Sequence, residues 1–185
     1  RGNGTEGQDI SHLRNYITFP TITDNKFAVR GELIISRTNW EKIKDIGSNA
    51  RNVVAGAIHS KIINKDLMSN IDFIAYDILS PKMKIEDVFN YFTKNNIKCA
   101  NYVLWDLDNI NLQSLSNHLE LRRNESDYEV DGIVVYNNNI HKVINGKNPK
   151  YAFAFKSILT HEQAEVTVSD VEWNVSMHKY MKPIV

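Results

Sequence analysis

Two short segments combine charged side chains with apolar runs in a way that could hold a nucleotide. Asp131 opens the run Asp-Gly-Ile-Val-Val at 131–135, and Lys156 ends the run Tyr-Ala-Phe-Ala-Phe-Lys at 151–156. A cation beside apolar residues is costly to bury unless an anion meets it, and phosphate is a natural partner. Upstream, Glu32 follows a glycine, and its carboxylate can accept two hydrogen bonds from a ribose diol.

Each of these patterns also has a plainer explanation when it is taken alone. Glu32 could be a solvent-facing strand residue, and Asp131 with Gly132 could open a hairpin. Lys156 could reach past apolar neighbours to solvent from the end of a strand. Only the order and spacing of several such segments can favour the functional explanation.

Composition limits the classes of protein that the chain can represent. Its 185 residues suffice for one substantial domain, or for one domain and the first strand of another. The 22 basic residues match 22 acidic ones, so any contact with DNA must be local or lie outside this chain. The single Cys99 excludes an internal disulfide, and six histidines without His-x-x-x-His spacing give no zinc signal. Without a transmembrane run or a signal peptide, we expect an intracellular protein.

Apolar periodicity predicts a mixture of helices and strands, followed by a run of strands. Helices are expected after a capping box at Thr38 and Glu41, ending at Gly47, and over 84–96 and 111–122. Strands are expected over 27–35, 71–79, 129–136, 140–144, 151–157 and 164–175. This order favours an α+β fold over a regular βαβ repeat.

Six blocks in order resemble the adenylation domain of NAD-dependent DNA ligases. They are the opening Arg-Gly-Asn-Gly-Thr-x-Gly-Gln-Asp-Ile-Ser at 1–11, Arg-Gly-Glu at 30–32, Ala-Arg-Asn-x-x-x-Gly at 50–56, Phe-Ile-Ala-Tyr at 73–76, Asp-Gly-Ile-Val-Val at 131–135 and Ala-Phe-Lys at 154–156. The tail from Val171 to Ser176, with Lys182 and Pro183, is similar to the exit strand of that family. The divergent form is closer to viral or otherwise unusual members.

The resemblance implies a nucleotidyltransferase fold, the ATP-grasp-like ligase adenylation domain, with mainly antiparallel sheets and flanking helices. It also implies two parts of the chain. Residues 1–165 would form a partial adenylation domain, and residues 166–185 would form a terminal strand and hinge toward an OB domain. We therefore expect the chain to be a fragment of a longer ligase.

The family's residue roles carry over to positions of this sequence as implications of the resemblance. Glu32 would bind the adenosine ribose, and Tyr76 would stack on the adenine. Arg51 and Arg123 would meet phosphates or the nicotinamide nucleotide.

Two further residues would serve the chemistry itself. Asp131 would organise the nucleophilic lysine and the nicotinamide end, and Lys156 would contact the AMP phosphate. No protein metal ligand is assigned.

The implied activity is nick sealing by three nucleotidyl transfers. A lysine takes AMP from NAD, the AMP passes to the 5′-phosphate of a nick, and the 3′-hydroxyl then displaces it. NAD and Mg²⁺ are the expected cofactors, and nicked double-stranded DNA is the expected partner of a monomer that has no membrane association. The cytoplasm, the nucleus or a viral factory is the expected location.

The sequence departs from the family at three places and so leaves other functions open. It contains no Lys-x-Asp-Gly nucleophile motif, which the family carries upstream of the glycine-rich opening. Tyr136 and His59 stand where the family has a lysine and an arginine. The alternatives are a catalytically lapsed domain that binds a nucleotide or a protein partner, an ATP-dependent DNA or RNA ligase, and a capping guanylyltransferase.

Overall fold

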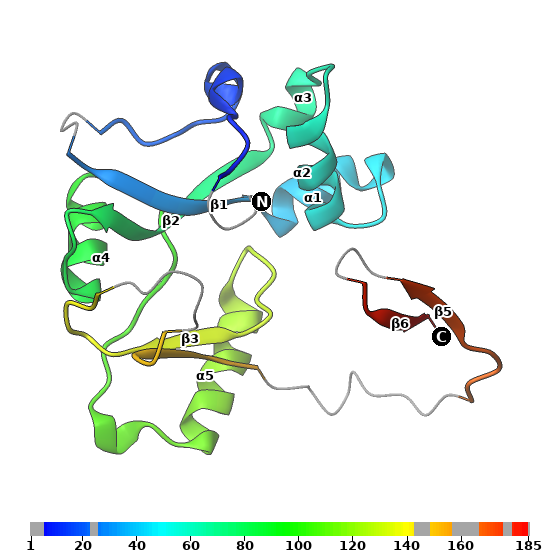
Figure 1. The fold of residues 1–185 in the computed structure, drawn as a ribbon. Coiled ribbons are helices and arrows are strands. Elements are labelled where there is room, and N and C mark those ends of the chain that lie inside the picture. The colour runs from blue at the N-terminus through cyan, green and yellow to red at the C-terminus, as the bar shows by residue number, and fades with distance from the viewer. Residues whose placement is uncertain (1–5, 23–25, 143–148, 157–166, 176–178, 185) are drawn as a thin grey trace.

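The computed structural model describes residues 6–22, 26–142, 149–156, 167–175 and 179–184. The strands form three antiparallel pairs, and helices come before, between or after them along the chain, which agrees with the predicted α+β class (Figure 1). The strands are β1 (Ala28–Ile35), β2 (Ile71–Ser80), β3 (Ile133–Tyr136), β4 (Ala152–Phe155), β5 (Glu172–Val175) and β6 (Met181–Ile184). The α-helices are α1 (Arg37–Ile43), α2 (Ala50–His59), α3 (Lys65–Met68), α4 (Ile85–Lys94) and α5 (Leu112–Glu125), and 3-10 turns span Ser11–Asn15, Lys44–Ile46 and Leu107–Asn109.

The long strands β1 and β2 form an antiparallel pair that carries one half of the candidate site. Glu32 lies opposite Ile74, and Gly31 lies opposite Ala75. The register shifts between Arg30 and Gly31, which leaves Tyr76 as an extra residue on β2. Such a bulge increases the local twist and changes the direction in which a side chain points.

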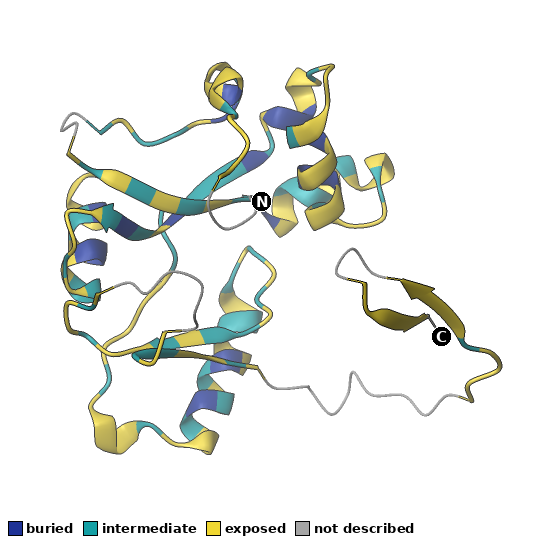
Figure 2. Ribbon diagram, viewed as in Figure 1, coloured by how far each residue is buried: buried dark blue, intermediate teal, exposed yellow. Residues whose placement is uncertain are grey.

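Two apolar clusters lie at opposite ends of this strand pair. One joins the end of β1 and the start of β2 to the N-terminal turn and to α2 and α3; Leu13, Ile35, Val54, Met68 and Ile71 are among its buried members (Figure 2). The other joins β2 to α4 and contains Ala75, Ile78, Val88, Phe89, Phe92 and Ile97. The helical spacing in α4 places its apolar side chains on one face, as the periodicity predicts.

The strand pair β3–β4 is tied to the β1–β2 pair through the segment that precedes β3. The Tyr128 hydroxyl donates to Asp72 of β2 at 2.8 Å, and the Lys98 ammonium lies 2.9 Å from the same carboxylate. The Arg37 amide donates to the Asp127 carbonyl at 2.6 Å. These contacts connect α1 and β2 to the segment leading into β3.

Most predicted elements are confirmed, and several boundaries are wrong. The strands at 27–35 and 71–79 and the helices at 84–96 and 111–122 are present. The strand predicted over 129–136 begins only at Ile133, residues 140–142 are not a strand, and within 167–175 only Glu172–Val175 is one. The parts of these predictions at 143–144, 157 and 164–166 lie outside the described residues. The sequence does not predict helix α2, because its valines, isoleucine and glycine have low helix propensity.

The predicted capping box at Thr38 and Glu41 is wrong. The N-cap of α1 is Ser36, whose hydroxyl accepts from the Asn39 amide at 3.1 Å. Thr38 lies inside the helix and instead donates from its hydroxyl to the Asp127 carboxylate at 2.8 Å. A partner 89 residues away in sequence therefore decided the role of this threonine. The helical segment does end at Gly47, as predicted.

Substitution of Ser36 tests this cap. Ser36 is buried, so Ser36→Ala removes a satisfied acceptor at a helix start and should lower the free energy of unfolding by about 1 kcal/mol. Chemical denaturation of the wild type and the variant measures the difference. Thr38→Ala serves as the comparison: a larger loss there than at Ser36 would show that Thr38 is the more important residue at this helix start.

Candidate functional site

The exposed face of the β1–β2 pair gathers one group of candidate residues. Glu32 and Arg30 alternate with the more buried positions of β1 and so share its exposed face. Tyr76 lies at the bulge opposite them with 41% of its surface exposed. The Arg30 guanidinium lies 3.9 Å from the Asp77 carboxylate. This face thus presents an aromatic ring together with both signs of charge.

The electrostatic environment of Tyr76 shows that these charges lie near its hydroxyl. Partial burial raises the pKa of Tyr76, the positive charge of Arg30 opposes that rise, and the carboxylates of Glu32 and Asp77 add to it. A neutral phenol ring beside a carboxylate can accommodate a flat base and a hydroxyl-bearing sugar. Glu32 and Tyr76 therefore lie near each other on this strand pair.

A second group forms around the carboxylate of Asp131. One oxygen, Oδ2, lies 3.9 Å from Arg51 Nη2 and 4.0 Å from Lys156 Nζ. Arg51 comes from α2 and Lys156 follows β4, so the three residues come from distant parts of the chain. Their side chains are 64–75% exposed, and ion pairs in such solvent contact contribute little to stability. Two cations are thus held close together and remain accessible to an anion.

At position 132 there is no space for a side chain, which explains the glycine after Asp131. A Cβ at Gly132 would lie 2.6 Å from the Phe155 carbonyl oxygen and 2.8 Å from Lys156 Cγ. The chain at Asp131 can approach the end of β4 only because no side chain intervenes. The Asp-Gly pair therefore brings the carboxylate and Lys156 to the same place.

Arg123 contacts the main chain beside Asp131 rather than an exposed surface. It lies in the last turn of α5, where its Nε donates to the Val130 carbonyl at 3.1 Å and its Nη2 donates to the Asp131 carbonyl at 3.3 Å. The side chain is half-buried. Sequence alone offered a phosphate contact for this residue and gave no indication of these two bonds.

Tyr136 at the end of β3 lies near the Asp77 side of the first group. Burial, the neighbouring Tyr151 and the charge of Asp77 on β2 raise the pKa of Tyr136 to about 12. Its ring meets the rings of Tyr151 and His141 edge-on at 5.2 and 5.9 Å, and those two rings stack at 4.0 Å. A cluster of three rings therefore occupies the end of β3, and the charge of Asp77 on β2 influences Tyr136 within it.

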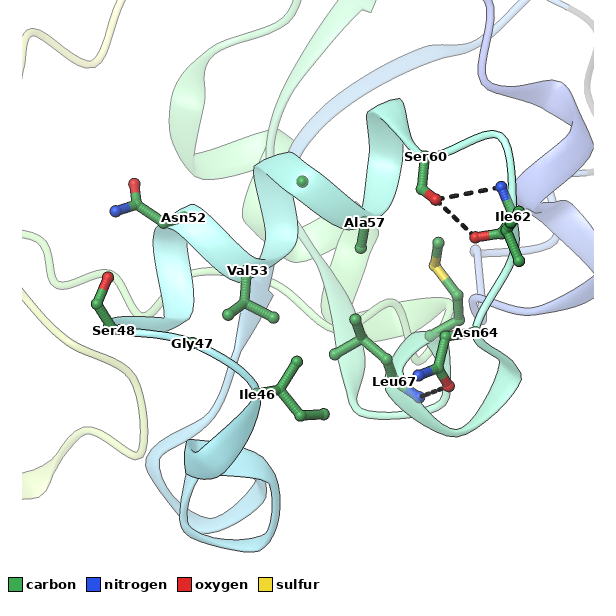
Figure 3. A pocket seen from close by; sticks show the side chains of 12 residues that line it. Ile46, Gly47, Ser48, Asn52, Val53, Ala57, Ser60, Ile62, Asn64 and Leu67 are labelled. Carbon is green, nitrogen blue, oxygen red and sulfur yellow. Dashed lines mark hydrogen bonds between the residues drawn. The ribbon is translucent and has the colours of Figure 1, made fainter.

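One concavity among the described residues lies away from both groups. A cavity of about 410 Å³ lies between α2, α3 and the turn before α2 (Figure 3). Its lining is mainly apolar and includes Val53, Ala57 and Leu67. The Ser60 hydroxyl at its edge bonds to Ile62, and the Asn64 side chain accepts from the Leu67 amide. The lining contains no charged residue and none of the predicted site residues, so it does not suit a phosphate.

The described residues show neither a metal cluster nor a membrane-spanning helix. They contain no group of three His, Cys, Asp or Glu side chains placed to hold a metal ion. In the same part of the chain, no helix is both long and apolar enough to cross a membrane.

Arg30 is a residue to which the sequence analysis assigns no role. It shares the exposed face of Glu32, and its positive charge opposes the rise in the pKa of Tyr76. The available signal was its position two residues before Glu32 on a strand, since alternate residues of a strand point to one side.

Comparison with known proteins places these observations in a family. Residues 1–158 match the family model described as NAD-dependent DNA ligase adenylation domain. The chain is 35% identical to a DNA ligase of Acanthamoeba polyphaga mimivirus over 99% of its own length and 29% of that protein. It is 28% identical to a DNA ligase of Clostridium botulinum, over 99% of this chain and 30% of the relative, and 27% identical to one of Clostridium tetani, over 99% and 29%. The chain thus spans about three tenths of the length of these relatives.

Proposed function

Because the chain belongs to the family of NAD-dependent DNA ligase adenylation domains, we propose that it binds the AMP part of NAD within a longer, nick-sealing enzyme. The observation that carries this proposal is the pair of exposed cations, Arg51 and Lys156, which lie 3.9 and 4.0 Å from one carboxylate oxygen of Asp131. An adenylyl phosphate entering there would meet two positive charges at once.

We further propose a role for each residue of the β1–β2 face. Glu32 accepts hydrogen bonds from the ribose hydroxyls, and Tyr76 stacks on the adenine. The support for this assignment is their common exposed face and the influence of the Glu32 charge on the Tyr76 hydroxyl. At the phosphate end, Arg51 and Lys156 contact the phosphate and Asp131 organises the nucleophilic lysine, while Arg123 bonds to the main chain beside Asp131.

The proposed first reaction is the transfer of AMP from NAD to a lysine of the complete protein. The lysine amine forms a bond to the adenylyl phosphorus, the bond from phosphorus to nicotinamide mononucleotide breaks, and the amine loses its proton. Negative charge builds on the phosphate oxygens during this step. Lys156 and Arg51 stabilise that charge, because both cations lie 3.9–4.0 Å from the Asp131 oxygen beside the proposed phosphate position.

Mg²⁺ enters the proposal through the substrate. It prefers oxygen ligands and is commonly held by one or two carboxylates together with substrate phosphates. No side chain is assigned to the ion, because the Asp131 carboxylate already lies near the cations of Arg51 and Lys156; substrate phosphates would supply its ligands. When bound, the ion would neutralise charge on phosphate oxygens.

The remaining parts of the proposal concern the whole enzyme. We propose that residues 1–165 belong to a nucleotidyltransferase domain and that residues 166–185, with β5 and β6, lead into an OB domain. Nicked double-stranded DNA is the proposed partner of a monomeric enzyme. It would work inside the cell, in the cytoplasm, the nucleus or a viral factory, because its substrates are found there.

Adenylate formation tests the function and the cofactor together. The complete protein, incubated with NAD labelled in its adenylyl phosphate, should retain label on a lysine, and excess EDTA should abolish the labelling. Label from ATP in place of NAD would refute the cofactor assignment. Labelling that survives EDTA would remove Mg²⁺ from the proposal.

A second candidate function has a specific observation in its favour. Tyr136 places a neutral phenol within an aromatic cluster, where the resemblance calls for a cation. A domain that binds the nucleotide without transferring it would accommodate this change. In that case the complete protein would bind NAD, as measured by calorimetry, and retain no covalent label.

A further inference from the structure

The main chain around Asp131 is held from two sides. On one side, the Arg123 guanidinium donates to two successive carbonyls, those of Val130 and Asp131, at 3.1 and 3.3 Å. On the other side, Gly132 lies so close to the end of β4 that an added Cβ would be only 2.6 Å from the Phe155 oxygen. The short segment 130–132 is thus clamped between α5 and β4.

The side chain of Asp131 needs such support. It is 64% exposed, and its contacts to Arg51 and Lys156 are at 3.9 and 4.0 Å, near the upper limit for an ion pair. Contacts of this length between solvated side chains exert little orienting force. The position of the carboxylate is therefore decided mainly by its backbone.

We propose that Arg123 is a positioning residue, which acts on the nucleotide site through Asp131 rather than by binding the nucleotide. The inference rests on the proposed function, because it concerns the adenylyl-transfer site of the same enzyme. A planar guanidinium can donate to two carbonyls in fixed directions, whereas an ammonium is a compact point charge and cannot reproduce that fork. The shape of the Arg123 side chain matters here as much as its charge.

The prediction separates the rate of adenylyl transfer from NAD binding. In the complete protein, Arg123→Ala should lower kcat for lysyl-adenylate formation about tenfold to a hundredfold and leave KM for NAD within about twofold, because small misplacements of reacting groups are costly. Arg123→Lys should behave like the alanine variant. A phosphate-binding arginine would behave differently: KM would rise, and lysine would restore much of the activity.

A double-mutant cycle identifies Asp131 as the intermediary. If Arg123 acts through that carboxylate, Arg123→Ala combined with Asp131→Asn should be no slower than Asp131→Asn alone. Multiplied losses would overturn the inference. Arg122→Ala is the matched control: it removes the neighbouring cation, which pairs with Glu125 at 3.3 Å, and should leave the rate unchanged.

Two further measurements keep the result unambiguous. Thermal unfolding is compared for every variant, and Arg123→Gln, which keeps one donor, replaces the alanine variant if that one does not fold. Wild-type labelling from NAD tests the proposed function independently. Labelled wild type with a raised KM in the Arg123 variants would refute the positioning role alone, and unlabelled wild type would refute the function.

Discussion

Lys156→Ala should lower the rate of lysyl-adenylate formation by the complete protein about a hundredfold to a thousandfold. The ammonium lies 4.0 Å from the Asp131 carboxylate and is 66% exposed, so it is available to a phosphate and unimportant for folding. Loss of one group that stabilises a developing charge costs a rate factor of this size. Single-turnover labelling from NAD provides the measurement.

Two control variants show whether the rate depends on the position of the Lys156 ammonium or only on its positive charge. Lys150→Ala removes an exposed lysine at the other end of β4 and should label at the wild-type rate. Lys156→Arg keeps the positive charge with a different geometry and should recover part of the loss. Thermal unfolding should differ by less than about 1 kcal/mol, because an exposed ion pair contributes little. Wild-type labelling in Lys156→Ala would place this lysine outside the reacting site.

Gly31→Ala should damage both the fold and the site. The new Cβ would lie 2.4 Å from the Phe73 ring and 2.5 Å from the Ile74 carbonyl oxygen. The ring can turn aside, but the carbonyl belongs to the partner strand, so β1 and β2 must separate. We expect a loss of about 1–3 kcal/mol in the free energy of unfolding. Because Glu32 and Tyr76 both lie on this strand pair, we also expect about a hundredfold slower adenylate formation.

Gly56→Ala is the matched glycine control. Gly56 lies in α2, and no atom comes within 4 Å of the Cβ that it would gain. Alanine in a helix is more favourable than glycine by up to about 1 kcal/mol, so this variant should be as stable as the wild type or more stable. Chemical denaturation of both variants and the wild type measures these differences in the free energy of unfolding. A Gly31→Ala protein as stable and as active as the wild type would contradict the close approach described for the strand pair.

The candidate site shows where local sequence sufficed. The alternation in 27–35 was enough to predict a strand on which Arg30 and Glu32 share one face, because side chains of a strand alternate. The apolar spacing of α4 predicted its buried face for the same kind of reason. The resemblance to ligases supplied the roles, and the family match over residues 1–158 confirms the family.

Other features depended on contacts between distant parts of the chain. The Thr38 hydroxyl bonds to Asp127, and Ser36 takes the place of the predicted cap before α1. Arg123 appeared in the sequence only as a cation eight residues before Asp131, and its two carbonyl partners follow from how α5 ends beside β3. Local patterns contain no information on such partners.

The sequence by itself determined the α+β class, the two long strands, the amphipathic helices and the family of this chain, because each follows from short-range periodicity or from ordered motifs. Tertiary structure alone decided that Arg51, Asp131 and Lys156 meet at one carboxylate oxygen. The physical reason is that a site built from separated segments depends on packing and strand register, and those are set by the whole fold.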